Sequence, residues 1–175
     1  MKRKTILKGN GFLLRPYKKV DAKSITKNAN NKKIARNMND RFPQPYALKD
    51  ARNWIKINQD KYRKQKYIAS FVIDVEGKAV GTIELSIKAS HEGSLGYWLG
   101  EKYWGRGIVS EAVKLITAYG FKKLKLRRIY AAIFPWNKAS KKVLLRNYFK
   151  FEGVLKKGNQ KDGRFIDDYL FAKVK

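Results

Sequence analysis

Two glycines, Gly105 and Gly107, stand between a short apolar segment and an amphipathic one, and they restrict how the middle of the chain can fold. The preceding segment, "SLGYWLG" (94–100), has the character of a short strand, and "SEAVKLITAYGFKKL" (110–124) has that of a helix. Glycine is tolerated where the backbone turns sharply or approaches another group closely. The sequence therefore predicts a tight strand-to-helix turn, with the helix beginning near Val109.

Such a turn can hold an anion. The first N–H groups of a helix have no intrahelical partner, and the helix dipole adds positive potential there. Glycines leave those N–H groups uncovered, Lys102 and Arg106 add charge, and Ser110 can cap the helix or contact an oxygen. Ser110 stands where a dinucleotide-binding turn has its third glycine, and the Gly-Lys-Ser/Thr ending of a nucleotide P-loop is absent. On the glycines alone, a turn without any ligand is an equal alternative.

The periodicity of the remaining chain predicts one domain over residues 1–175, of mixed α/β (α+β) class, with a mostly antiparallel sheet flanked by helices. Helix 48–65 is expected to turn Trp54, Ile57 and Tyr62 to one apolar side, and Asp21 is a candidate N-cap. The expected strands are 11–19, 67–75, 79–88, 94–100, 127–134, 151–158 and 165–174, and the expected helices are 21–38, 48–65, 110–124 and 137–149.

Composition excludes several classes of protein. With 175 residues, 43% of them hydrophobic, the chain can build a core, and no apolar run approaches the roughly 18 residues of a membrane span. We see no signal peptide. The absence of cysteine excludes disulfides, thiolate zinc sites and cysteine nucleophiles, and it fits a cytoplasmic protein.

The charge is strongly positive: 41 Lys and Arg against 14 Asp and Glu give 41 − 14 = +27. Such a surface attracts polyanions such as RNA without a specific site, although a Lys- and Asn-rich source composition would explain it equally well. The candidate basic patches are "RKQKY" (63–67) and "KKLKLRR" (122–128), and a solvated helix face is the favoured interpretation of both.

Several motifs, in order along nearly the whole chain, resemble the Gcn5-related N-acetyltransferases (GNAT), and most of all the branch that acetylates the N-termini of ribosomal proteins. The family's phosphate motif, Q/R-x-x-G-x-G/A, is matched by residues 102–107 with Lys102 in first place. The branch's other motifs are matched by "FPQPYALKDARNWI" (42–55), "GYWL" (96–99), Glu111-Ala112, and Asn137 with Ser140.

The resemblance implies an acyltransferase that moves an acetyl group from acetyl-CoA directly to a primary amine, with no acyl-enzyme and no metal. It implies that the pyrophosphate lies on residues 105–110, and the pantetheine along strand 94–99 where this strand splays from 128–134. The residues expected to contact the coenzyme are Leu99, Lys102, Trp104, Gly105, Arg106, Gly107, Ile108, Val109, Ser110, Asn137 and Ser140.

The resemblance also suggests proton donors to the leaving thiolate. Ser140 is the first candidate, and an ordinary first-turn serine is the alternative of similar weight. Other family members use a tyrosine near here, and Tyr148 is the available one. Helical spacing with Leu144 and Leu145 favours a core role for Tyr148 and Phe149.

The general base is the open question, because Ser94 stands where many relatives carry a glutamate. We favour Glu84, on the adjacent expected strand. Asp167 matches an aspartate common in the branch's last strand, and Glu92 lies in the loop before Ser94. Each of these carboxylates has a solvated or structural role as its alternative.

The acceptor is expected to be the N-terminal α-amine of a protein, of the ribosomal-protein type. An α-amine has a pKa near ~7.8 against ~10.4 for lysine, so it is neutralised at about 3.5 kcal/mol less cost. The alternatives are a small amine such as a polyamine, an amino acid or an antibiotic, and a non-catalytic RNA-binding module. The acceptor loops would lie near 38–48 and 157–166; the sequence leaves monomer and homodimer open.

Overall fold

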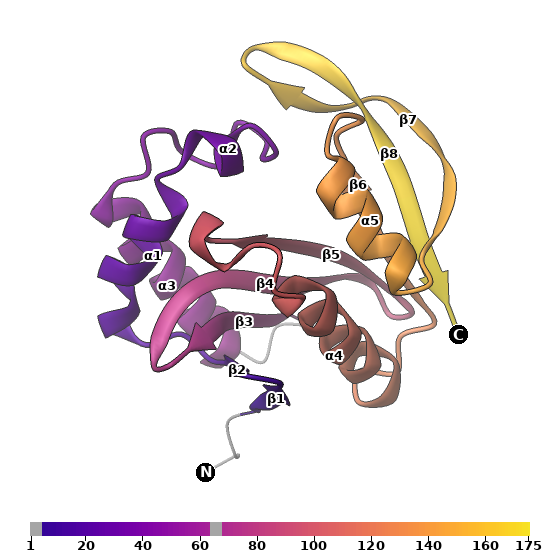
Figure 1. Ribbon diagram of the computed structural model, residues 1–175. Coiled ribbons are helices and arrows are strands. Elements are labelled where there is room, and N and C mark those ends of the chain that lie inside the picture. The colour runs from indigo at the N-terminus through magenta and orange to yellow at the C-terminus, as the bar shows by residue number, and fades with distance from the viewer. Residues whose placement is uncertain (1–4, 64–67) are drawn as a thin grey trace.

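The computed structural model describes residues 5–63 and 68–175 (Figure 1). The elements are β1 Leu7–Gly9, β2 Phe12–Arg15, η1 Lys19–Asp21, α1 Ala22–Ala29, α2 Lys32–Ala35, α3 Leu48–Arg63, β3 Ile68–Val75, β4 Lys78–Ala89, β5 Glu92–Leu99, η2 Glu101–Tyr103, α4 Ile108–Lys122, β6 Arg128–Ile133, α5 Lys138–Arg146, β7 Lys150–Lys161 and β8 Arg164–Val174.

The described strands form one eight-stranded sheet in the order β1-β2-β3-β4-β5-β6-β8-β7. Every neighbouring pair is antiparallel except β5 and β6, which are parallel and are connected through α4. Figure 1 shows the sheet with helices on both faces and the long β7–β8 hairpin extending past the body. This confirms the expected mixed, mostly antiparallel sheet flanked by helices.

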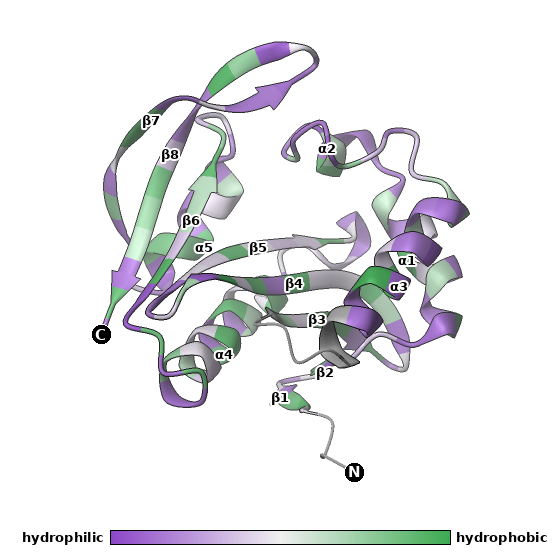
Figure 2. Cartoon of the chain, turned by 180° about the vertical axis from the view of Figure 1, so that it is seen from behind, coloured by the Kyte–Doolittle hydropathy of each residue, from purple (hydrophilic) through white to green (hydrophobic). Residues whose placement is uncertain are grey.

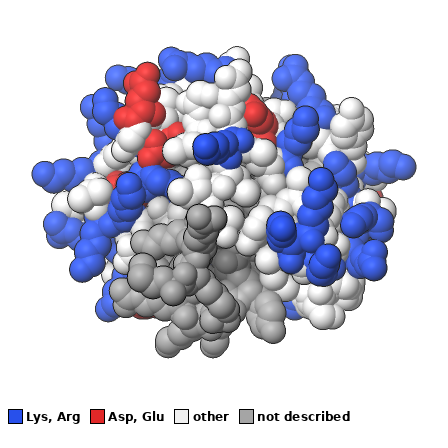
Figure 3. Space-filling model, turned by 90° about the horizontal axis from the view of Figure 1, so that it is seen from below, with Lys and Arg blue, Asp and Glu red and all other residues white. Residues whose placement is uncertain are grey.

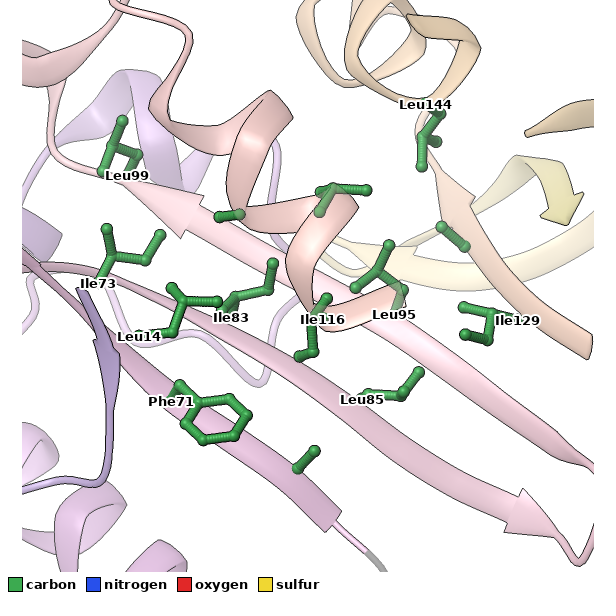
Figure 4. Close-up of a cluster of buried hydrophobic side chains, with 14 of the residues drawn as sticks. Leu14, Phe71, Ile73, Ile83, Leu85, Leu95, Leu99, Ile116, Ile129 and Leu144 are labelled. Carbon is green, nitrogen blue, oxygen red and sulfur yellow. The ribbon is translucent and has the colours of Figure 1, made fainter. Parts of the chain in front are cut away.

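Two hydrophobic cores hold the helices to the sheet. The larger core joins the sheet to α4 and α5, and Figure 4 shows Ile116 of α4 and Leu144 of α5 among its strand residues. The smaller core lies under α1 and α3 and contains Ile25, Ile55 and Trp98. Alternation along the strands assigns successive side chains to these two cores.

Helix α4 approaches the sheet closely at Gly120. A Cβ on Gly120 would lie 2.7 Å from Leu85 Cδ2 and 2.9 Å from Ile129 Cδ1, so no larger residue fits without displacement. The close contact is made to β4 and β6 at once. It therefore fixes the crossover helix over β4 and β6, the two neighbours of β5 in the sheet.

A buried ionic network joins β2 to η1 and to β3. Arg15 donates from Nη1 and Nη2 to the two carboxylate oxygens of Asp21, both at 2.8 Å, and from Nε to Asp74. All three side chains are less than a tenth exposed. The two carboxylates hold the pKa of Arg15 above its usual value, the hydrogen bonds that Arg15 donates to Asp21 being the largest cause.

The N-terminal edge differs from the expectation. Leu7–Gly9 forms a strand that was not predicted, paired with β2 through a turn at Asn10-Gly11. Gly11 has φ +73°, and Asn-Gly is a strong hairpin signal that the expected start of the strand at residue 11 overlooked. Asp21 precedes α1 as expected, but its carboxylate accepts from Lys18 N and Arg15 and makes no cap to α1.

Two helix predictions are also corrected. In α3, Trp54 packs against the smaller core as expected, but Ile57 is 46% exposed, and the fully buried positions are Ala51, Ile55 and Asn58. The side chain of Tyr62 lies outside the described residues. Helix α5 ends at Arg146, so Tyr148 is not helical: it has φ +63° and is 80% exposed, which excludes the core role expected for it. Phe149 is buried, as expected.

Polar residues cover most of the outer surface. Figure 2 shows hydrophilic residues spread over α1, α3 and β7. In the patch 122–128, Lys122, Lys123, Lys125 and Arg127 are exposed, at the end of α4 and in the turn after it. The patch 63–67 lies outside the residues whose side chains are described. No helix in the described ranges has the length and apolar character that crossing a bilayer requires.

We predict that Arg15→Ala destabilises the protein by about 3–5 kcal/mol, because it leaves two buried carboxylates without their cation. Urea unfolding measures the loss. The control is Lys156→Ala, which breaks an exposed pair with Asp167 and should change the stability far less than Arg15→Ala does. Equal losses in the two variants would contradict the proposed contribution of the buried network.

Candidate active site

The parallel pair β5–β6 separates after three register positions. Glu92 pairs with Arg128, Gly93 with Ile129 and Ser94 with Tyr130, and no further pair follows. Beyond this point residues 95–99 and 131–134 border two adjoining cavities of about 350 Å³ and about 200 Å³, here called the first and second cavities. The expected splaying of strand 94–99 from 128–134 is confirmed.

The first cavity lies against the glycine turn and the starts of α4 and α5. Of the residues expected to hold a coenzyme, Lys102 and Arg106 do not line it; both are exposed on the turn, with Arg106 over the Tyr103 ring. The others do. Its described lining is Lys33, Ile34, Asn37, Met38, Tyr97, Trp98, Leu99, Tyr103, Trp104, Gly105, Gly107, Ile108, Val109, Ser110, Asn137, Ala139, Ser140, Val143 and Arg146.

The two glycines are required by the backbone conformation. Gly105 has φ +76° and Gly107 φ +75°, in the left-handed region that side chains disfavour. A Cβ built on either glycine meets no protein atom within 4 Å. The space in front of the turn is therefore open, as a site for a large anion requires, and the predicted tight turn is confirmed.

Helix α4 begins at this turn with its N-terminus uncapped by any side chain. Gly107 is the N-cap residue, which corrects the suggestion that Ser110 caps the helix. Ser110 lies in the first turn, where its carbonyl and Oγ accept from the buried amide of Asn147, at 3.0 and 3.2 Å. That contact ties the end of α5 to the start of α4, beside the first cavity.

Helix α5 starts where the two cavities meet. Asn137 is its N-cap, with Oδ1 accepting from Ser140 N at 3.1 Å. Asn137, Ser140 and Tyr97 line both cavities. The Tyr97 hydroxyl is buried beside Ser140; burial raises its pKa to about 12, and the interaction with Ser140 partly offsets this rise.

The second cavity is lined from both acceptor loops that the sequence suggested. Asn37, Met38 and Asn39 come from the segment after α2, and Asn159 from β7. The remaining described lining residues are Leu95, Gly96, Tyr97, Ala131, Ala132, Ile133, Phe134, Asn137, Ser140 and Asp168. The loops also contact each other, because Asp40 accepts from Asp162 N at 2.9 Å and donates its own N–H to Gln160 O at 3.4 Å.

None of the three carboxylates considered as bases lines either cavity. Glu84 accepts from Ser86 Oγ and lies near Tyr17, and its Oε2 is buried without a hydrogen-bond partner among the described residues. Glu92 is the first residue of β5, not a loop residue, and pairs with Arg128. Asp167 pairs with Lys156, and hydrogen bonds, first that of Lys157 N, lower its pKa.

Tyr148 also lies apart from the cavities. It borders neither of them, and Lys173 Nζ lies 5.3 Å from its ring centroid. The buried tyrosine beside Ser140 is Tyr97, which the sequence reasoning treated as part of a strand motif. Its place in "GYWL", at the point where β5 separates from β6, was the available signal.

Asp168 is the second residue that the sequence reasoning missed. It is 2% exposed and lines the second cavity, whereas its neighbour Asp167 points to the hairpin surface. Adjacent strand residues face opposite sides, so only the register could decide between the two aspartates. That register contains shifts between Leu155 and Asn159, which local sequence does not reveal.

Known proteins match the chain in sequence and in structure. Residues 12–150 match the profile of the family described as "Acetyltransferase (GNAT) domain". An uncharacterized N-acetyltransferase, p20, of Bacillus licheniformis is 34% identical over 131 residues, which are 73% of this chain and 74% of that protein.

Two solved structures combine overall similarity with recognisable identity. A ribosomal-protein-S5-alanine acetyltransferase from Vibrio fischeri is 28% identical, with a TM-score of 0.83, covering 97% of this chain and 96% of that one. A microcin C7 self-immunity acetyltransferase, solved with acetyl-CoA and AMP, is 25% identical, with a TM-score of 0.84 and coverage of 95% and 94%. Among the described residues, no group of three or more His, Asp or Glu could hold a metal ion.

We predict that Gly107→Val abolishes stabilisation by acetyl-CoA, because a β-branched residue is strained at φ +75° and its side chain fills the open space before the turn. Wild type should gain about 2.7 kcal/mol at a hundredfold excess over Kd, measured as a melting shift. The control is Gly163→Val, with φ +72° at the β7–β8 turn, which should keep the shift. An undiminished shift in Gly107→Val would place the coenzyme elsewhere.

Proposed function

The chain belongs to the GNAT acetyltransferase family and is an N-acetyltransferase that uses acetyl-CoA, and from this premise we propose that its acceptor is the N-terminal α-amine of a protein. The proposal includes the ribosomal-protein type of acceptor. The Vibrio fischeri protein, a ribosomal-protein-S5-alanine acetyltransferase that is 28% identical over nearly the whole chain, supports it. The residues that line the second cavity give this proposal further support.

The first cavity fits acetyl-CoA. The uncapped start of α4 offers N–H groups to the diphosphate, and the left-handed glycines leave room for it. Lys33 and Arg146 add cationic groups to the lining, while Trp98, Leu99 and Val143 supply apolar surface. Acetyl-CoA brings the acetyl group as a thioester, which an amine attacks directly.

The residues at the junction serve the transfer itself. Ser140 is held by the start of α5, where Asn137 accepts from its backbone N–H. Ser140 lines both cavities, so we assign its hydroxyl as the proton donor to a leaving sulfur on one side while the nitrogen stands on the other. The buried hydroxyl of Tyr97 lies beside it.

The second cavity favours an α-amine over a polyamine. A polyamine carries several positive charges and needs several carboxylates, but one acidic residue, Asp168, occurs in the described lining. A lysine ε-amine costs about 3.5 kcal/mol more to neutralise than an α-amine, because its pKa is higher by roughly 2.6 units. A cavity of about 200 Å³ with one carboxylate suits a single, weakly basic nitrogen on a small residue.

The basic surface supports an acceptor that is presented beside RNA. Lys and Arg predominate over Asp and Glu on the face shown in Figure 3, in line with the net charge of +27. Such a surface draws the enzyme toward phosphate backbones through counterion release, with no base-specific contact needed. Ribosomal proteins are themselves basic, so we infer that the attraction is to the surrounding RNA.

We predict that the enzyme acetylates peptides with a free N-terminal Ala or Ser, and leaves unmodified the same peptides when the α-amine is blocked and a lysine is available. The difference follows from the lower cost of neutralising an α-amine. Release of CoA thiol measures turnover, and mass spectrometry locates the acetyl group. Turnover of polyamines, free amino acids or antibiotics, with none of peptides, would refute the proposed acceptor.

We predict that Ser140→Ala lowers kcat by about a hundredfold or more, because the leaving sulfur loses its positioned proton donor. Steady-state kinetics with the peptide substrate measure the loss. Binding of acetyl-CoA, followed as a melting shift, should be retained. Ser94→Ala, on β5 but outside both cavities, is the control and should keep kcat. Wild-type kcat in Ser140→Ala would remove the assigned role.

A further inference from the structure

The second cavity has an acidic lining within a strongly basic protein. The chain carries 41 Lys and Arg, yet none of the described residues lining this cavity is Lys, Arg or His. The lining contains four asparagines, a serine and a tyrosine, and Asp168 is its one charged member among the described residues. Any charged group that enters the cavity therefore meets a carboxylate and neutral dipoles.

Asp168 has an unused acceptor. Oδ2 accepts from Asn159 Nδ2 at 3.2 Å, whereas Oδ1 is buried and has no hydrogen-bond partner among the described residues. The side chain is 2% exposed. A buried ionised carboxylate with an unpaired oxygen is costly, and a hydrogen-bonded cation relieves that cost. A protonated amine is the cation that an N-acetyltransferase must admit.

We propose that Asp168 binds the acceptor's ammonium group in the second cavity and removes the proton that the nitrogen must lose before it attacks. The inference rests on the proposed function only in taking a primary amine as the acceptor. Asp168 thereby becomes a catalytic residue, because it touches the reacting nitrogen. It fills the role for which the sequence suggested Glu84, Glu92 or Asp167.

The transfer of the acetyl group from the thioester to the amine moves two protons from the nitrogen. The ammonium nitrogen gives one proton to Asp168 Oδ1, and its freed electron pair forms the C–N bond to the thioester carbonyl carbon. The C–S bond breaks, and the sulfur receives the second proton of the nitrogen by way of the Ser140 hydroxyl. The products are an N-acetylated amine and CoA thiol, and Asp168 releases its proton to solvent once they leave.

The groups around Asp168 suit this exchange. Burial, the largest cause, raises the pKa of Asp168, the Asn159 amide lowers it, and the negative charge of Asp167 raises it. The segment 37–39 contributes two asparagines and a methionine, and residues 131–134, at the end of β6 and just after it, contribute apolar side chains. A raised pKa brings the carboxyl closer to the pKa of an α-amine, so that less free energy is needed to move the proton.

The experiment compares Asp168→Asn with Asp167→Asn on two peptides that differ only at the first residue, alanine or 3,3,3-trifluoroalanine. The fluorines withdraw electrons, so the second α-amine is mostly neutral at pH 7. We expect Asp168→Asn to lose about a hundredfold or more in kcat/KM at pH 7 on the alanine peptide. On the fluorinated peptide the loss should fall below about tenfold, since no proton need be removed before the nitrogen attacks.

Asp167→Asn is the matched control, because it removes a charge one residue away on the hairpin surface. It should stay within about twofold of wild type on both peptides. All three proteins should show the same melting shift with acetyl-CoA. Similar kcat/KM in the two variants, or an equally large loss on both peptides in Asp168→Asn, would overturn the proposal, since Asp168 would then only shape the cavity.

A second variant covers the case in which Asp168→Asn does not fold. Asn159→Ala removes the hydrogen bond that lowers the pKa of Asp168. The pKa should therefore rise, and the fall of kcat/KM on the acid side of its pH profile should move to higher pH. An unmoved limb would count against Asp168 as the group that titrates. If the acceptor proves to be a small amine, the proposed function fails, and the same variants are compared on that amine and its fluorinated analogue.

Discussion

The short parallel pairing of β5 with β6 is the constraint on which the site depends. The two strands pair at three positions and then diverge, although both continue within the sheet through their other neighbours, β4 and β8. Each strand beyond Ser94 and Tyr130 thus keeps one paired edge and turns the other toward the cavities. A parallel pair requires a crossover, and the crossover is α4, so its uncapped N-terminus comes to the same opening.

Opposite ends of this opening are held by different interactions. At the end where β5 and β6 are still paired, Arg128 forms ion pairs with Glu92 of β5 and with Glu152 of β7. These ion pairs join strands on both sides of β6. Gly93 and Gly120 let Leu85 and Leu126 pack tightly beneath that end. At the open end, Asp40 bridges the segment after α2 to the β7–β8 turn. The separation of the strands is therefore built into the packing at both ends.

Features that depend on local backbone chemistry could be predicted from the sequence. The turn at Gly105 and Gly107 needs left-handed backbone, and most residues expected around a coenzyme line one cavity. Features that depend on register and on the last turn of a helix could not. Tyr148 leaves α5 because the helix ends at Arg146, and the choice between Asp167 and Asp168 follows from irregular pairing of β7 with β8.

The positive charge of the chain and the acidic lining of its second cavity act over different distances. The exposed lysines and arginines create a potential that salt screens within roughly 10 Å and that repels any polycation in solution. Inside the cavity, burial weakens screening, so a single carboxylate dominates the local field. An acceptor with one ammonium group experiences weak repulsion outside and strong attraction within, whereas a polyamine would place its further charges among asparagines that cannot neutralise them. The two fields together therefore favour acceptors with an isolated amine.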